Sequence, residues 1–162
     1  MQREELIIKI IDELRAQNKT VSFAESCTGG LLASEFTRIA GVSDVLKGSM
    51  VTYSNAIKHK WLGVDDAVLE RFGAVSHQCV EQMLRGIQKE AASDTAIAIS
   101  GIAGPGGGSA EKPVGTVYIG ILLDDTLDIN HCLFKGTRRD IQEGSVDFAL
   151  ELLKKELNIS LI

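Results

Sequence analysis

The chain has few of the residue types that build disulfide-linked, metal-bound or membrane-spanning proteins. Only three cysteines occur among its 162 residues, and no two of them are closely spaced. An odd number without close spacing predicts neither a disulfide framework nor a CxxC metal site, and it fits a reducing compartment. No apolar run approaches the ~20 residues that a bilayer-spanning helix needs. Residues 1–5 are polar and begin a helical pattern, so we expect no signal peptide, no membrane contact and a cytoplasmic location.

Positive charge is also scarce. The 17 basic residues are outnumbered by 22 acidic ones, which leaves a net charge of −5. This balance argues against a nucleic-acid partner, because such proteins usually carry a basic stripe that neutralises phosphates. The hydrophobic content of 44% and charged content of 24% are typical of a soluble globular protein. The length suits one domain, residues 1–162, with a core of ordinary size.

Hydrophobic periodicity predicts alternating helices and strands. The first helix carries an apolar stripe of Leu6, Ile7, Ile10, Ile11 and Leu14. Further helices are expected at 30–39, 55–62, 65–71 and 76–92, and from 137 or 140 onward. Strands are expected at 20–25, 47–54, 95–100, 114–123 and 126–134, the last two forming a hairpin. We therefore predict an α/β fold, three-layer α/β/α, with a mixed, mostly parallel sheet.

Three polar segments each follow a predicted strand: residues 25–30, 52–58 and 100–108. Ligand sites in open α/β sheets form beyond the carboxyl ends of strands, so we expect these segments to meet at one edge. The first could be only a capped turn between strand and helix, or it could hold an anion or expose a nucleophile at a helix N-terminus.

Ser26 is the candidate nucleophile, and it needs a base that accepts its proton. His59, His77 and His131 occupy positions typical of surface or packing residues. The remaining candidate base is Lys58, whose pKa burial would lower towards neutrality, with Tyr53 as a proton relay or an orienting group. A solvated Lys58 is the structural alternative. Cys27 is a rival nucleophile, since its position favours a lowered thiol pKa.

The glycine-rich segment after the third strand resembles an anion cradle. Small residues let backbone N–H groups approach a ligand closely, and the segment contains Gly101, Gly104, Gly106, Gly107 and Gly108. It lacks the GxxxxGK[ST] pattern of a P-loop, and a flexible loop is the alternative. Arg138 and Arg139, at the start of the last helix, could pair with a phosphate or carboxylate, or could simply be solvated.

Several motifs occur in an order that resembles one family. The segments Ala24–Gly30, Gly41–Val64, Gly73–Ser76, Ala98–Gly108 and Glu111–Gly120 are similar to the C-terminal domain of the CinA (competence/damage-inducible) proteins. The resemblance runs from about Thr20 to Arg138, and the first helix is compatible with it. Family members occur alone at about this length or behind another domain, and this chain resembles the stand-alone form.

The resemblance implies hydrolysis of nicotinamide mononucleotide to nicotinic acid mononucleotide and ammonia, within pyridine-nucleotide recycling. It implies a Ser–Lys site without metal or cofactor, and a homodimer. Ser26, Tyr53 and Lys58 match the family's catalytic serine, tyrosine and lysine. The implied substrate contacts are Ser43, Ser100, Gly101 and Arg138, and the glycine loop adds Gly104 and Gly107. For the oxyanion we expect either backbone N–H groups of Thr28, Gly29 and Gly30 or the Ser43 hydroxyl.

The sequence departs from the family pattern at two positions. Gly106 stands where an aspartate is frequent, and Gln142 stands where a second arginine is frequent. The first change should alter only the loop, whereas the second removes one half of a two-arginine phosphate clamp. Two other kinds of function stay open at this point: a nucleotide-binding regulatory module without turnover, and a structural assembly domain.

Overall fold

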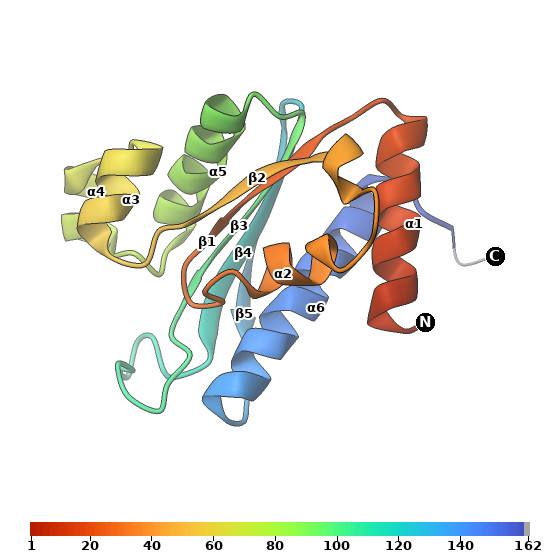
Figure 1. Ribbon diagram of the computed structural model, residues 1–162. Helices are drawn as coiled ribbons and strands as arrows, with labels where there is room; N and C mark the ends of the chain where they lie inside the picture. The colour runs from red at the N-terminus through yellow and green to blue at the C-terminus, as the bar shows by residue number, and fades with distance from the viewer. Residues whose placement is uncertain (161–162) are drawn as a thin grey trace.

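The computed structural model describes residues 1–160 and contains a five-stranded sheet between two helical layers (Figure 1). The elements are α1 (Arg3–Ala16), β1 (Val21–Glu25), α2 (Leu31–Thr37), the 3₁₀ helix η1 (Val42–Asp44), β2 (Leu46–Val51), α3 (Asn55–Leu62), α4 (Asp66–Phe72), α5 (His77–Ala91), β3 (Thr95–Gly101), β4 (Thr116–Leu123), β5 (Thr126–Leu133) and α6 (Arg138–Glu156). The predicted three-layer α/β/α fold is confirmed. The described helices include none that is both long enough and apolar enough to cross a bilayer.

The sheet has the order β2-β1-β3-β4-β5. Strand β1 pairs in parallel with β2 and with β3, whereas β3–β4 and β4–β5 are antiparallel. The sheet is therefore mixed, as predicted. Because β1, β2 and β3 run in the same direction, the segments that follow them leave from one edge.

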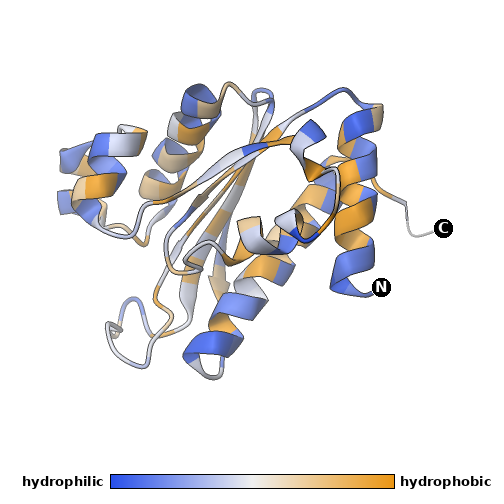
Figure 2. Ribbon diagram, in the orientation of Figure 1, coloured by the Kyte–Doolittle hydropathy of each residue, from blue (hydrophilic) through white to orange (hydrophobic). Residues whose placement is uncertain are grey.

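Two apolar clusters hold the layers together. One lies between the sheet and helices α1, α2 and α6, and it contains the whole predicted stripe of α1. The other lies between the opposite sheet face and helices α3, α4 and α5. Figure 2 shows hydrophobic residues along the strands and helices, interspersed with hydrophilic ones. The strands β1 and β3 are buried along almost their whole length, as expected for strands covered on both faces.

Helix α3 sits close against α5 because Gly86 of α5 has no side chain. A Cβ at Gly86 would collide with the backbone of Leu62 at the end of α3. This close approach fixes the helix that carries Lys58.

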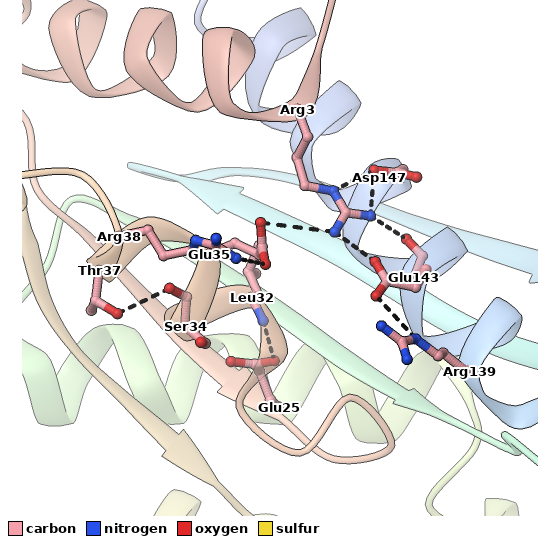
Figure 3. Close-up of polar contacts among 10 residues, drawn as sticks. All are labelled: Arg3, Glu25, Leu32, Ser34, Glu35, Thr37, Arg38, Arg139, Glu143 and Asp147. Atoms are coloured by element: carbon pink, nitrogen blue, oxygen red, sulfur yellow. Dashed lines mark hydrogen bonds and ion pairs between the residues drawn. The ribbon is translucent and has the colours of Figure 1, made fainter.

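Arg3 ties the other helical layer together (Figure 3). Its guanidinium lies 2.6 Å from Glu143 and 2.8 Å from Asp147 of α6, and 3.9 Å from Glu35 of α2. This contact joins the start of α1 to the two helices that border the carboxyl edge of the sheet.

Candidate active site

A pocket of about 260 Å³ opens at the carboxyl edge of the parallel strands. Residues from all three predicted polar segments line it, so their expected convergence is confirmed. The lining consists of Ser26, Cys27, Tyr53, Asn55, Lys58, Ala74, Val75, Ser100, Gly101, Ile102, Ala103, Gly104, Gly106, Gly107 and Arg138. Its size is near the lower end for small-molecule sites.

Ser26 and Lys58 meet on the floor of this pocket. Lys58 Nζ lies 2.9 Å from Ser26 Oγ, although 32 positions separate the residues in sequence. The Ser26 N–H donates to Ile99 O at 3.0 Å, which extends the β1–β3 pairing by one residue. Lys58 lies on the buried face of α3, one turn after Ser54, whose hydroxyl caps that helix.

The Lys58 amine is enclosed and has only uncharged hydrogen-bond partners. Its side chain is 1% exposed, and Nζ donates to Thr52 O at 2.7 Å and Tyr53 O at 3.1 Å. No carboxylate among residues 1–160 forms an ion pair with it. Burial therefore lowers the pKa of Lys58 below its ordinary value of 10.5, and the nearby Cys79 and Cys27 thiols only partly oppose this effect. A lowered pKa favours the neutral amine that proton abstraction requires.

Cys27 does not have the lowered pKa that we expected from its place before a helix. Its thiol is buried, and burial raises the pKa to about 11 even though Lys58 and Arg138 act in the opposite direction. A buried thiol of this kind stays protonated near neutral pH and is a poor nucleophile. The thiols of Cys79 and Cys132 are also free and buried.

Tyr53 and Arg138 meet at the mouth of the pocket. The Tyr53 side chain is 60% exposed, and its hydroxyl accepts a hydrogen bond from Arg138 at 2.7 Å. The same guanidinium donates to Gly104 O at 2.7 Å. The Tyr53 hydroxyl thus bonds to Arg138, and the contact of Tyr53 with Lys58 is made by its backbone carbonyl. Because Lys58 Nζ and Ser26 Oγ are already in direct contact, this arrangement does not need the Tyr53 hydroxyl as a proton relay between them.

The Ser100 hydroxyl and the glycine loop form one wall. The hydroxyl donates to Ala74 O at 2.8 Å, which links β3 to the segment before α5. A Cβ at Gly101 would lie 2.6 Å from Val117 Cγ2 and 2.8 Å from Thr116 O, so β4 requires glycine there. Gly106 has open space around it. An aspartate would fit at that position, which agrees with the expectation that this family departure alters only the loop.

The structure does not bring Thr28, Gly29 and Gly30 into this pocket. They line a separate, more open hollow of about 540 Å³ with Leu31, Ser34, Arg139, Gln142 and Glu143. The Thr28 hydroxyl is buried and donates to Glu25, and the Gly29 N–H donates to Ser26 O. The Gly29 N–H, one of the backbone donors that we expected to stabilise an oxyanion, is therefore already bonded within the turn.

Ser43 lies at the opposite edge of the sheet. It is exposed in η1, just before β2, whereas Ser26 follows the parallel strand β1. Ser43 precedes β2, whereas the predicted polar segments of the pocket follow their strands. The sequence order alone therefore indicates that Ser43 lies away from the pocket of its own chain. This expected substrate contact is therefore not made by the chain's own Ser43.

Gln142 contacts the backbone beside Ser26, although it is not part of the pocket. Its side-chain amide donates to Cys27 O at 2.9 Å and so joins α6 to the turn after β1. Sequence reasoning assigned no role to five further residues that line the pocket, although all of them lie in the motif segments: Asn55, Ala74, Val75, Ile102 and Ala103. Of these, Asn55, Ile102 and Ala103 lie in the predicted polar segments 52–58 and 100–108, whereas Ala74 and Val75 lie in neither.

The histidines lie away from the pocket lining, as their positions in the sequence suggested. His59 Nδ1 lies 2.7 Å from Val64 O, and the ring of His131 stacks on Tyr118. Within residues 1–160, no group of three or more His, Cys, Asp or Glu side chains is arranged to hold a metal ion.

Comparisons with known proteins show which family the chain resembles. The family model described as the CinA C-terminal domain matches residues 3–157. The chain is 49% identical over 144 residues to a putative competence-damage inducible protein of Moorella thermoacetica, covering 89% of the chain and 35% of that protein. It is 44% identical over 158 residues to a CinA-like protein of Thermotoga neapolitana, covering 95% of the chain and 37% of that protein. The chain thus spans little more than a third of the length of these curated relatives.

Solved structures resemble the chain over nearly its whole length. A competence/damage-inducible protein from Agrobacterium tumefaciens superposes with a TM-score of 0.92 at 43% identity, covering 96% of this chain and 94% of that one. A CinA superfamily protein from Klebsiella pneumoniae gives a TM-score of 0.93 at 34% identity, covering 98% and 99%.

Proposed function

The chain belongs to the CinA C-terminal domain family, and from that premise we propose that it is an amidohydrolase with Ser26 as nucleophile and Lys58 as base. The observation that carries this proposal is the 2.9 Å contact between Lys58 Nζ and Ser26 Oγ in a site that lowers the amine's pKa. Two carbonyls accept the two N–H bonds of a neutral amine. Its lone pair is then left for the hydroxyl proton of Ser26.

The reaction proceeds in two stages. In the first, Lys58 takes the Ser26 proton while Oγ attacks the carboxamide carbon, and the protonated amine then gives that proton to the departing ammonia. In the second, Lys58 takes a proton from water, the hydroxide attacks the acyl carbon, and the ester bond to Ser26 breaks with return of the proton to Oγ. The product is a carboxylic acid, and Ser26 and Lys58 regain their starting protonation states.

The proposed substrate is nicotinamide mononucleotide, which would be deamidated to nicotinic acid mononucleotide in pyridine-nucleotide recycling. Two features support an anionic substrate with a small reactive end. Within residues 1–160, Arg138 at the mouth is bonded only to uncharged acceptors, Gly104 O and the Tyr53 hydroxyl, so its positive charge is free to pair with a phosphate. The pocket volume suits an aromatic carboxamide, with the phosphate near the rim. Binding energy from the phosphate would then position the amide.

The test is ammonia release from nicotinamide mononucleotide by wild type, Ser26→Ala and Lys58→Ala. We expect each variant to lose at least ~10²-fold in kcat/KM, because a base alone contributes roughly 10²–10⁴-fold. Lys60→Ala, on the exposed side of the same helix, is the matched control and should keep full activity. Near-normal turnover by either site variant would exclude this mechanism.

A nucleotide-binding module without turnover is the alternative that calorimetry separates. Wild type that binds the nucleotide but releases no ammonia would replace the enzymatic proposal with this one. In either case Arg138→Ala should weaken binding of the nucleotide much more than binding of the phosphate-free nucleoside.

A further inference from the structure

Glu25 is a buried carboxylate directly before the proposed nucleophile, and the mechanism does not use it. Its side chain is 0% exposed. One oxygen accepts from the Thr28 hydroxyl at 2.7 Å and the Leu32 N–H at 2.9 Å. The other accepts from the Ala33 N–H at 3.0 Å and the Ser49 hydroxyl at 3.3 Å. Figure 3 shows the carboxylate reaching towards the backbone of Leu32.

These contacts replace a missing helix cap. The residue at the N-cap position of α2 is Gly30, which has no side chain that could accept the free N–H groups of the first turn. Glu25 supplies both acceptor oxygens from the end of β1. It thereby closes residues 26–30 into a short loop whose two ends are held by one side chain.

The backbone of Glu25 is fixed as well. Its carbonyl accepts the Thr52 N–H at 2.9 Å, and the Thr52 carbonyl in turn accepts from Lys58 Nζ at 2.7 Å. Glu25 is therefore linked to the start of the nucleophile loop through its side chain and to the base through its main chain. It does not line the pocket, so it has no contact with a substrate.

We propose that Glu25 is the positioning residue that holds Ser26 Oγ within proton-transfer distance of Lys58. The inference rests on the proposed function, because it assumes that Ser26 is the nucleophile. The carboxylate acts through the loop that it closes: without both of its acceptor oxygens, the first turn of α2 and the Ser26 turn lose their common anchor.

The variant Glu25→Gln tests this role with almost no change in shape. Because each oxygen accepts from one backbone N–H, an amide NH₂ on either side would face a second donor. We expect kcat to fall by about 100-fold, the effect of a misplacement near 1 Å, with KM nearly unchanged. Thr28→Val, which removes one hydroxyl donor and keeps both backbone bonds, should give a smaller loss of kcat and serves if the glutamine variant does not fold.

Asp94→Asn is the matched control. The Asp94 carboxylate accepts from the Thr20 N–H at 2.8 Å and the Thr20 hydroxyl at 3.1 Å, at the amino edge of the sheet. Its change to an amide should lower the melting temperature and leave kcat intact. A purely structural role of Glu25 would give the same pattern as this control.

A second readout separates this inference from the choice of substrate. A fluorophosphonate probe reacts with an activated serine by forming an O–P bond and releasing fluoride, and intact mass reports the rate at Ser26. We expect Glu25→Gln to slow this rate in parallel with kcat. A folded Glu25→Gln protein with wild-type labelling and turnover would overturn the positioning role and leave the amidohydrolase proposal intact. Wild type that is labelled but releases no ammonia would refute the substrate alone, whereas wild type that is not labelled would refute both proposals.

Discussion

Replacing Lys58 with methionine should change the pH dependence of stability in a defined direction. Methionine has nearly the same length as lysine but carries no titratable group. The site is 1% exposed, so the native wild type must either desolvate an ammonium or leave the amine neutral. Burial lowers the pKa of Lys58 below its ordinary value of 10.5, which means that the unfolded chain binds a proton more readily than the folded one.

The sign and the limiting slope follow from proton linkage. Between the folded and unfolded pKa values of Lys58, the unfolded state holds up to one more proton than the native state. Wild-type stability therefore rises with pH in that window, by at most ~1.4 kcal/mol per pH unit. Below the folded pKa the penalty is constant and fully present, and above 10.5 it is absent. Loss of the amine also leaves two carbonyls without their donor, at roughly 1–3 kcal/mol each, but this cost does not depend on pH.

The measurement is urea unfolding of wild type and Lys58→Met at several pH values from 7 to 10.5. We expect the free energy of unfolding of the variant, relative to wild type, to decrease steadily across the upper part of this range. Lys60→Met, exposed on the same helix, should show a difference that does not vary with pH. A constant difference for Lys58→Met would mean that the amine is equally protonated in both states, and the reasoning about a neutral base would fail.

Three further predictions concern the pocket. The kcat/KM of the wild type should rise with pH as one proton is lost, with a midpoint below 10.5, because the pKa of Lys58 is lowered and only the neutral amine accepts the Ser26 proton; a flat profile would contradict this. Cys27→Ser should keep kcat/KM within about threefold in the ammonia assay, since burial raises the pKa of that thiol to about 11; loss of activity in Cys27→Ser together with retained activity in Ser26→Ala would identify the thiol as the nucleophile. Gly101→Ala should lower the free energy of unfolding by about 1–3 kcal/mol, because the added Cβ would overlap β4. Gly106→Asp should change the free energy of unfolding by no more than about 0.5 kcal/mol. Denaturant titration of both variants checks this difference.

The helices and strands were predictable because periodicity and capping residues marked them. The stripe in α1 is buried as expected, and Thr137 and Asp140 form a capping box that starts α6 at Arg138. The predicted second strand, 47–54, is in the structure Leu46–Val51. The residues after Val51 leave the sheet, and two of their carbonyls bind Lys58. The strand propensity of a short segment does not reflect such long-range hydrogen bonds.

The parts of the site that depend on strand direction could be predicted from the sequence. The parts that depend on the burial of side chains could not. The meeting of Ser26 with Lys58 followed from the rule that ligand sites lie beyond strand ends, combined with a family resemblance. The direction of the Cys27 pKa shift was wrong because enclosure of the thiol cannot be read from its position before a helix. Thr28 was expected to offer its backbone N–H to an oxyanion, but it lies in a separate hollow outside the pocket, where its hydroxyl donates to Glu25.

The pairing of two adjacent strands controls the reactive geometry. Ser26 directly follows Glu25, and Glu25 is paired with Val51 in the β1–β2 ladder. The turn between β2 and α3, which begins at Thr52, then places Lys58 next to Ser26. A single residue inserted between Asn55 and Lys58, inside α3, would turn Lys58 by about 100° around the helix axis and away from Ser26, since an α-helix has 3.6 residues per turn. The number of residues between Val51 and Lys58 is thus a sharper criterion for recognising relatives that share the Ser26–Lys58 contact than the presence of a serine and a lysine.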